Sequence, residues 1–529
     1  MSLARSLRLA QPRNVQKVMV LVVLLIASAA IATFHRKPRV WLPEQTPVAF
    51  WAWRNQSPSE VDVRLALDET KAHAIFLRAG QIDIHDGNLR RIRPVIGSLP
   101  KQVDLHLVYN GTRSLLSQLE RVDERALADA IIEAYRTDFE RAAREHARVV
   151  GLQIDIDVPT RLLGRYEKML RALRAQLKPS TQLSITGLPT WMESAQLQST
   201  LAPVDFWIPQ FYGSEIPERS DQLIPISSVE SIASFVNQAR ELDKPFYAGL
   251  AAFSWTLLYS SSGQLISVRG DMDPEVIAAD QNLELIDQRP FGSTDAAGRS
   301  SVSNEWRYGY RARADGVTDE LAMHSGDVLV VDVPSAESLR MSARTVRELA
   351  GKKLLGVCVF RLPGENDPAT LSVKQVAAAM ADVDSTVEVE VRILPDLQPP
   401  VSQASASNWI LEVTNAGTAN ATIGSAQIDL QVSTGQIESL TPKRSDLLQS
   451  LCAPAGATKT VGAQPCSQRR ANVIRFRPNV LRAGQTVTAR LAMNLSASKA
   501  IPVFIEMQTE TGQPYRNRLE IIAESEANR

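Results

Sequence analysis

The stretch Gly151-Leu152-Gln153-Ile154-Asp155-Ile156-Asp157 decides how the middle of this 529-residue chain folds. Apolar and polar side chains alternate along it, and successive side chains of a β-strand point to opposite faces. We expect the apolar face to pack against helices and the polar face to point inward. Two inward carboxylates must then be paired or hydrogen-bonded. The polar side chains that share this face are Gln153, Asp155 and Asp157.

Short β-rich runs recur through residues 48–360 with room for a helix between neighbours. Two intervening segments, 123–148 and 160–178, carry apolar residues at spacings of three and four, which predicts amphipathic helices. Alternating strands and helices indicate parallel strands with right-handed crossovers, and eight strands suggest a closed (β/α)8 barrel. An open doubly wound sheet is the alternative, although no glycine-rich nucleotide loop follows the first strand. The expected strands are Val48–Trp53, Ala74–Arg78, Val103–Tyr109, Val149–Asp157, Leu183–Leu188, Asp205–Tyr212, Pro245–Ala251 and Leu354–Phe360.

The interval before the last strand is too long for a loop. Residues 253–325 contain turn signals and predict an insertion, and the apolar run Val328–Val333 leaves open which strand closes the barrel. From about Asp384, short alternating runs separated by Gly, Pro, Asn and Ser predict an all-β sandwich of immunoglobulin-like type. The expected boundaries are therefore 1–39 for a basic leader and anchor, 40–383 for the barrel and 384–529 for the sandwich.

The N-terminus contains an apolar stretch, residues 18–34, between two groups of basic residues. This length is close to the minimum of about 17 residues for a membrane-spanning helix, and it also fits a signal sequence. We expect an uncleaved single-pass anchor in a bacterial inner membrane, with the bulk of the chain on the periplasmic side. Secretion to the periplasm after signal cleavage is the alternative.

Charge balance and cysteine content limit the partners and cofactors that we expect. Lys+Arg and Asp+Glu both number 58, and no basic run with interleaved aromatic residues is present, so we expect no nucleic-acid partner. Cys452 and Cys466 flank a polar loop and either form a disulfide in an oxidising compartment or remain two free thiols. No cysteine or histidine spacing suggests zinc, and we expect no metal or other cofactor.

Asp155 and Asp157 end a strand at the place where barrel enzymes keep their chemistry. Their backbone positions are about 6–7 Å apart, close enough for the two carboxyl groups to interact. One then tends to hold a proton while the other ionises, as a general acid and its electrostatic partner require. The alternative is a structural pair held by arginine or backbone amides.

The same stretch resembles the barrel-strand motif of family 18 glycoside hydrolases, the chitinases and their relatives: glycine, apolar, Asp, apolar, Asp, any residue, Glu. The resemblance implies that Asp157 is the catalytic acid that protonates the leaving oxygen. It also implies that Asp155 orients the substrate N-acetyl group. Gln153 stands in place of the first Asp, and Asp157 stands in place of Glu. In this family mechanism the substrate amide attacks the anomeric carbon, so no protein nucleophile is needed.

A second match is Pro209-Gln210-Phe211-Tyr212, which resembles the family's substrate-contacting strand and implies that Gln210 and Tyr212 contact substrate. Leu188–Trp191 and Phe360–Pro363 are more similar to an uncharacterised bacterial family of unknown function with this barrel. Further expected substrate contacts are Gln153, Trp191 and Arg361. Several aromatic residues near strand ends fit a sugar site, although most are expected in the core. They are Trp51, Trp53, Tyr109, Trp191, Tyr212 and Trp255.

Arg78 and Arg361 end strands, and they either steady the carboxylates, bind an anionic ligand or form a salt bridge within the barrel mouth. Together these features predict an envelope-anchored glycoside hydrolase-like protein that cleaves an amino-sugar-containing glycan with acid assistance. Its partners would be a carbohydrate or envelope polymer and, through residues 18–34, the membrane. The alternative is a catalytically inactive barrel that binds glycan or scaffolds an envelope assembly, which the two replaced family carboxyl positions favour.

Overall fold

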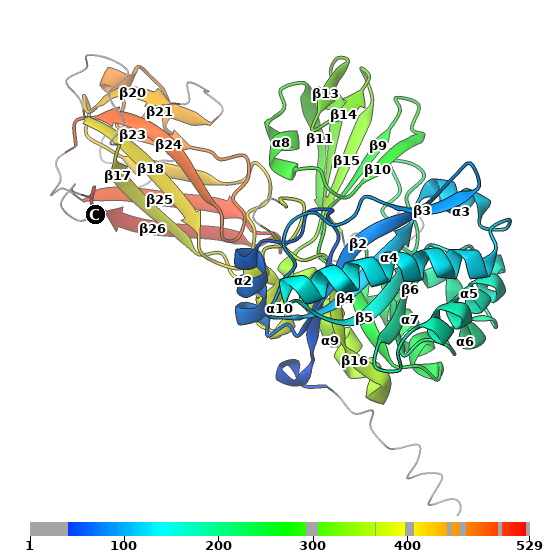
Figure 1. Ribbon diagram of the computed structural model, residues 1–529. Helices are drawn as coiled ribbons and strands as arrows, with labels where there is room; N and C mark the ends of the chain where they lie inside the picture. The colour runs from blue at the N-terminus through cyan, green and yellow to red at the C-terminus, as the bar shows by residue number, and fades with distance from the viewer. Residues whose placement is uncertain are drawn as a thin grey trace, which may run out of the picture.

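The computed structural model describes residues 41–291, 305–364, 367–396, 407–441, 447–453, 462–495 and 500–524. Eight parallel strands form a closed barrel in the order β1-β16-β8-β7-β6-β5-β4-β2, and β1 pairs with β2 to complete the ring (Figure 1). The predicted eight-stranded parallel barrel is confirmed, and the run at 354–360 is the strand that closes it. The barrel strands are β1 (Val48–Ala52), β2 (Ala74–His85), β4 (Asp104–Gly111), β5 (Arg148–Asp155), β6 (Gln182–Gly187), β7 (Phe206–Pro209), β8 (Phe246–Ala251) and β16 (Leu354–Phe360).

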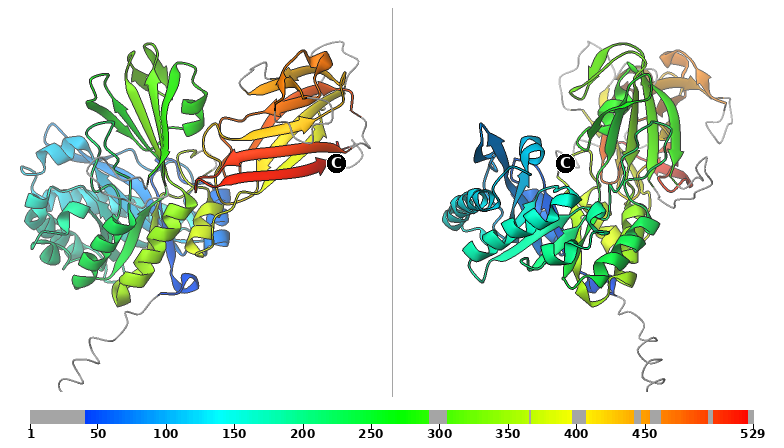
Figure 2. Two further views of the ribbon diagram at one scale, coloured as in Figure 1. Left: turned by 180° about the vertical axis from the view of Figure 1, so that it is seen from behind. Right: turned by 90° about the vertical axis from the view of Figure 1, so that its right-hand side faces the viewer.

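Helices cover the outside of the barrel (Figure 2). In α4 (Glu124–Glu145), the Asp123 side chain accepts a hydrogen bond from the backbone N–H of Ala126 and so caps the first turn. In α5 (Leu163–Gln176), the buried residues recur at spacings of three and four, as predicted. The other helices are α2 (Glu60–Thr70), α3 (Arg113–Gln118), α6 (Leu197–Thr200), α7 (Val229–Glu241), α9 (Ala336–Leu349) and α10 (Val373–Met380).

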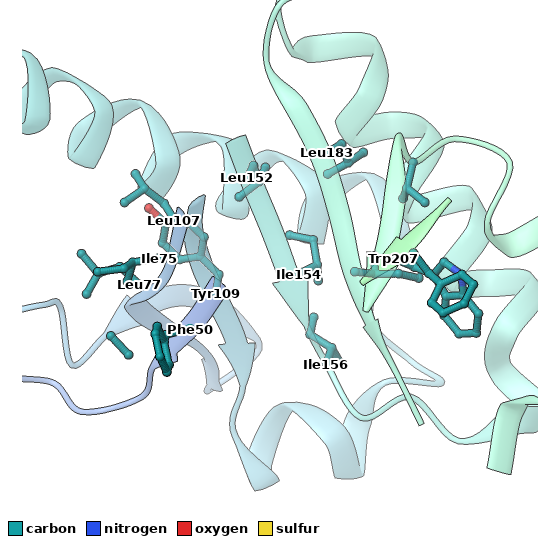
Figure 3. Packing of buried hydrophobic residues seen from close by; sticks show 14 of the residues in the cluster. Phe50, Ile75, Leu77, Leu107, Tyr109, Leu152, Ile154, Ile156, Leu183 and Trp207 are labelled. Atoms are coloured by element: carbon teal, nitrogen blue, oxygen red, sulfur yellow. The ribbon is translucent and has the colours of Figure 1, made fainter. Parts of the chain in front are cut away.

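The alternation in β5 separates two cores. Leu152, Ile154 and Ile156 point outward and belong to the large apolar layer between the barrel and its helices (Figure 3). The inward side chains of the barrel form a second cluster, in which the His106 ring stacks on Phe76 with a centroid distance of 4.4 Å. Burial lowers the pKa of His106 to about 3, so the imidazole is neutral at physiological pH.

Gly151 opens the decisive stretch because the barrel interior leaves no room for a larger residue. A Cβ atom at this position would overlap Nδ1 of His106 on β4 and would lie 2.9 Å from the carbonyl oxygen of Gln182 on β6. Both neighbours pair with Gly151 in the strand register. The glycine therefore lets β5 fit between its two partners.

Beyond the barrel, β2 continues into an antiparallel pairing with β3 (Asn88–Ile92). Asp86 and Gly87 form the turn with φ of 49° and 76°, as two-residue hairpins require.

After β8 the chain leaves the barrel and builds the predicted insertion. Its five-stranded antiparallel sheet has the order β10-β9-β15-β12-β11, and α9 then leads back to the barrel. The run at 328–333 is β15 of this sheet, so it is not a barrel strand. The elements of the insertion are β9 (Trp255–Tyr259), β10 (Leu265–Arg269), α8 (Pro274–Ala279), β11 (Leu283–Pro290), β12 (Trp306–Ala312), β13 (Gly316–Thr318), β14 (Leu321–Met323) and β15 (Val328–Val333).

The C-terminal region forms two antiparallel sheets, ordered β17-β18-β24-β20 and β22-β21-β23-β19-β25-β26. Residues of both sheets share one apolar core, which explains the alternating pattern in the sequence. Cys452 and Cys466 form a disulfide between β21 and the segment after β22. The strands are β17 (Val389–Pro395), β18 (Ser407–Asn415), β19 (Gln427–Gln431), β20 (Ile437–Thr441), β21 (Leu448–Cys452), β22 (Gln464–Pro465), β23 (Val473–Phe476), β24 (Thr486–Met493), β25 (Ile501–Gln508) and β26 (Pro514–Ile521).

The barrel, the insertion and the C-terminal domain meet at Glu510. Its carboxylate accepts hydrogen bonds from the backbone N–H groups of Ala336, at the start of α9, and Asn420 in the C-terminal domain, at 3.2 and 3.0 Å. Its carbonyl oxygen accepts one from the Trp306 indole of the insertion. Burial raises the pKa of Glu510 to about 8. The three parts are thus joined by hydrogen bonds to the side chain and the backbone of one buried residue.

The chain enters the barrel at the amino-terminal ends of its strands. Trp41 donates from its indole N–H to the carbonyl oxygen of Gly351 at 2.9 Å, just before β16 begins. In the parts of the chain that the structure describes, no helix is long and apolar enough to cross a membrane. The predicted anchor at residues 18–34 lies outside the described residues.

Candidate functional site

The two acids lie at the carboxyl end of β5, where the sequence predicts them. Asp155 is the last residue of the strand and is half-buried, whereas Asp157, two residues later, is exposed. The Thr186 hydroxyl at the end of β6 donates to Asp155 Oδ1 at 2.6 Å. Asp157 has no hydrogen bond or ion pair with any other described residue. One carboxyl group is therefore fixed in orientation and its neighbour is free.

The pKa values of both acids are raised. Burial and then the charge of Asp157 raise the pKa of Asp155 to about 7, while the Thr186 hydrogen bond and the charge of Arg78 act in the opposite direction. The pKa of Asp157 is also raised, because the protein around its carboxyl group excludes part of the solvent. The pair therefore retains a proton at pH values where isolated aspartates are ionised.

Gln153 lies below the acids, fully buried inside the barrel. Its Oε1 accepts a hydrogen bond from the Trp51 indole at 2.7 Å, and its Nε2 donates to the Ser184 hydroxyl at 3.5 Å. The amide is thus bound on both sides by protein groups. A neutral amide here avoids burying a third carboxylate beneath Asp155, and it has no exposed surface for the predicted substrate contact.

Gln210 and Tyr212 follow β7, and Phe211 between them packs in the opposite direction, against Phe235 and Phe246. The Tyr212 ring contacts Phe253 and Phe360, each with a centroid distance of 5.9 Å. Burial, followed by the negative charge of Asp155, raises the pKa of the Tyr212 phenol well above its usual value. The structure therefore places Tyr212 within electrostatic reach of the acids.

The side chain of Gln210 is half-buried and makes no hydrogen bond within the described part of the chain. Its amide is therefore free to bind a ligand.

Arg78 and Trp53 form a second group at the same end of the barrel. The Arg78 guanidinium lies over the Trp53 ring, 4.9 Å from its centroid. Its Nε donates to Asn110 Oδ1 and its Nη1 donates to the carbonyl oxygen of Trp53, both at 3.2 Å. Because Asn110 pairs in register with Asp155, this group is adjacent to the acids. Arg78 influences Asp155 through its charge rather than by direct contact.

Trp191 lies in η3 (Pro189–Trp191), and its ring is fully buried. Its indole N–H donates to the carbonyl oxygen of Val158 at 2.8 Å, and its ring packs edge-on against Tyr166. The residue therefore fixes the segment that follows Asp157. No ring face is exposed to support the predicted stacking on sugar.

Arg361 is engaged within the protein. It binds both oxygens of Asp367, at 2.6 and 2.7 Å, and donates to the carbonyl oxygen of Gly270. It is therefore part of a salt bridge at the barrel mouth and forms no ion pair with Asp155 or Asp157 within the described residues.

The other aromatic residues differ in position. Tyr109 is fully buried and donates to Asp138 of α4, so it belongs to the outer core. Trp51 is inside the barrel, and Trp255 is buried where the insertion begins. Trp53 is the member of the set that remains partly exposed at the barrel mouth.

Three contributors were missed from the sequence: Thr186, Asn110 and Phe360. Thr186 and Asn110 are the next-to-last residues of β6 and β4, Phe360 is the last residue of β16, and the two-residue alternation places each on the inward face. The missing information was the register between strands. No group of three or more His, Cys, Asp or Glu side chains suited to a metal occurs among the described residues.

Residues 112–288 match the model of a family described as a domain of unknown function (DUF3142). This span contains both acids, Gln210 and Tyr212. None of the curated proteins matches the sequence.

Similar solved structures include the spore cortex-lytic enzyme SleL of Bacillus cereus (13% identity, 64% of this chain and 74% of that chain, TM-score 0.39). A chitinase from Chromobacterium violaceum ATCC 12472 is also similar (13% identity, 64% of this chain and 98% of that chain, TM-score 0.42). A third is a glycoside hydrolase family 18 N-acetylglucosaminidase from Paenibacillus barengoltzii (12% identity, 63% of this chain and 99% of that chain, TM-score 0.38). The resemblance to chitinase-like barrels and to a family of unknown function is thus found by comparison as well as from the motifs. At these identities the activity has to be argued from the site.

Proposed function

We propose that this protein is a glycoside hydrolase-like barrel that cleaves an amino-sugar-containing glycan with acid assistance. Asp157 is the general acid and Asp155 is its electrostatic partner. The observation that carries the proposal is the unequal pair at the end of β5, in which Thr186 holds Asp155 while Asp157 is exposed and unbonded to any described residue. A proton donor needs open approach by its substrate and a raised pKa; Asp157 is exposed, and its pKa is raised by burial of its carboxyl group.

The step follows the resemblance to family 18. Asp157 transfers its proton to the glycosidic oxygen as the bond from that oxygen to the anomeric carbon breaks. The carbonyl oxygen of the substrate's own acetamido group forms the new bond to that carbon. In the reacting state the proton of the pair is on Asp157, and the ionised Asp155 accepts a hydrogen bond from the acetamido N–H and stabilises the positive charge that develops. Water then opens the cyclic intermediate and returns a proton to Asp157. Gln210 and Tyr212 contact the sugar on the side of β7.

A specific observation favours the second candidate, a barrel that binds glycan without cleaving it. Gln153 occupies the position of a family carboxylate, and its side-chain amide is hydrogen-bonded to Trp51 and Ser184. Asp157 is also one methylene shorter than the family's glutamate. Under this alternative the same surface binds sugar, and no bond is broken.

The location is part of the proposal. We infer a single-pass anchor at residues 18–34 in a bacterial inner membrane, with the barrel in the periplasm. The position of Trp41 supports this arrangement, because a tether there leaves the carboxyl end of the barrel facing away from the membrane. The Cys452–Cys466 disulfide fits an oxidising compartment. The C-terminal domain is proposed to be an immunoglobulin-like sandwich that acts as a spacer or an accessory binding module.

The test is cleavage of N-acetylglucosamine oligomers and peptidoglycan fragments by the full-length protein in detergent, followed by mass spectrometry. Asp157→Asn should lower the rate at least about 100-fold, the lower end of what general acid catalysis contributes. Asp86→Asn, in the exposed β2–β3 turn, is the matched control and should leave the rate unchanged. Binding without cleavage would support the inactive barrel, and an absence of both would refute both candidates.

A further inference from the structure

Arginines surround Trp53 at the carboxyl end of the barrel, and they are not equally neutralised. Arg361 and Arg54 both contact Asp367, and Arg361 uses both carboxylate oxygens. Arg78 forms no ion pair within the described part of the chain. Its charge is balanced only at longer range, by Asp155. Among Arg54, Arg78 and Arg361, Arg78 is therefore the one that lacks a paired carboxylate within the described residues.

The guanidinium of Arg78 is held in a fixed position. Nε and Nη1 are bound to Asn110 and to the carbonyl oxygen of Trp53, and the Trp53 ring supports one face of the group. Nη2 has no hydrogen-bond partner among the described residues. An arginine that is oriented in advance loses little further freedom when it binds an anion, and its planar fork matches a carboxylate.

The surroundings leave this charge uncompensated. Burial and then the nearby Arg93 lower the pKa of Arg78, which shows that its environment disfavours the cation, although an arginine stays protonated at neutral pH. Asp155, with its pKa raised to about 7, is largely protonated at pH 6 and then contributes little negative charge. A ligand anion beside Nη2 would restore the balance.

The position of Arg78 relative to Asp155 and Asp157 indicates which sugar of the glycan would carry the anion. Arg78 on β2 is level with Gln153 on β5, two residues before Asp155, so the backbones of Arg78 and Asp155 are about 12 Å apart across two strand spacings. The Arg78 side chain reaches Asn110 on β4, and Asn110 pairs in register with Asp155 on the next strand. A group bound to Arg78 therefore lies on the sugar at the reacting bond or on the next one along the chain.

We infer that Arg78, supported by Trp53 and Asn110, is a carboxylate-binding subsite and that the glycan is acidic, with a carboxylate on or next to the sugar at Asp157. This inference rests on the proposed glycan function and names its substrate class. The carboxylate belongs either to a uronic acid or to a lactyl ether on an amino sugar, because both present the same planar anion to the guanidinium.

Calorimetric titration of the full-length protein in detergent at pH 6 tests the inference. One pair of ligands is an oligosaccharide of alternating N-acetylglucosamine and glucuronate, with its carboxylates free or methyl-esterified. A second pair alternates N-acetylglucosamine and lactyl-bearing N-acetylmuramate, again as acid and ester. The N-acetylglucosamine tetramer is the uncharged reference. The pair that shows a preference identifies the source of the carboxylate.

The wild-type protein should bind one free acid about tenfold more tightly than its ester, the scale of a charge-assisted hydrogen bond at a partly exposed site. Arg78→Gln should remove this preference and retain binding of the neutral tetramer. Arg54→Gln removes an exposed arginine from the same end of the barrel and should keep the preference.

Equal affinity of the wild-type protein for acid and ester, with the tetramer still bound, would overturn the inference and leave the proposed function standing. Persistence of the preference in Arg78→Gln would also overturn it. If no oligosaccharide binds, the proposed function fails and the inference fails with it. The comparison of acid with ester in the wild-type protein needs no variant, so it holds even if Arg78→Gln is unstable.

Discussion

Adding one methyl group at Gly151 should destabilise the barrel. The new Cβ atom of Gly151→Ala would overlap Nδ1 of His106 and come within 2.9 Å of the Gln182 carbonyl oxygen. The imidazole cannot turn aside freely, because it stacks on Phe76 and meets Phe206 edge-on, with centroid distances of 4.4 and 5.6 Å. The carbonyl oxygen belongs to a strand paired with β5. Either the ring or the strand must therefore shift.

Overpacking a core costs 1–3 kcal/mol, and two rigid neighbours place this variant at the upper end, at about 3 kcal/mol. For a domain larger than 150 residues, this free energy corresponds to a fall of about 6 °C in the melting temperature. Calorimetry of the full-length protein measures the shift in the transition of the barrel.

The matched control is Gly164→Ala, in the first turn of α5. There the nearest atoms are those of the Gln196 amide at 3.9 Å, so the methyl group meets ordinary contacts. Alanine favours a helix by up to about 1 kcal/mol over glycine, so the melting temperature should be unchanged or rise slightly. On a His106→Ala background, the cost of Gly151→Ala should shrink. The reasoning would be refuted if the melting temperature of Gly151→Ala were within about 1 °C of the wild-type value.

Two further predictions concern pH and oxidation state. The pKa of Asp155 is about 7 in the folded protein against 3.8 for the free side chain, so the folded state binds the extra proton between these values and stability should fall as pH rises through this window. Asp155→Asn should flatten that fall, by up to about 3 kcal/mol, when thermal unfolding is compared at pH 4.5 and 8; identical pH profiles would contradict this. Replacing Cys452 and Cys466 with serine removes a bridge with a sequence separation of 14 and should destabilise the C-terminal domain by about 3 kcal/mol. Calorimetry should show its transition moving to lower temperature while the barrel transition stays in place, and unchanged transitions would argue against a stabilising bridge.

The barrel was predictable because its signals are local. Each of its strands is a short β-rich run, and those eight runs are the eight strands of the closed ring. A helix follows most of them, but β2 is followed by β3 and has no helix before β4. The closing strand was not predictable, since the runs at 328–333 and 354–360 are both apolar. What separates them is that Phe360 and its neighbours pair with β1, more than 300 residues earlier, and no local pattern records such a pairing.

The site was predictable only to the extent that alternation fixes direction along one strand. Gln153 and Asp155 were placed on the inward face because of their spacing alone. Thr186, which holds Asp155, depends on the register between β5 and β6, which the sequence does not show. Trp191 and Arg361 follow strand ends as sugar-binding residues do. Their directions are set by partners that become neighbours only in the folded chain, the Val158 carbonyl oxygen and Asp367. The roles of Asp157, Gln210 and Tyr212 remain predictions.

The ring order also constrains how this protein can be made. Strand β16 inserts between β1 and β8, and the whole insertion separates β8 from it in the chain. During synthesis or translocation from the N-terminus, β1 and β8 therefore each wait with one unpaired edge until residue 360 has emerged. Unpaired strand edges are sites of aggregation, and pairing between distant segments is slow. The nascent chain is thus most vulnerable while the insertion is being made, and a chaperone that shields β1 and β8 would act in that interval.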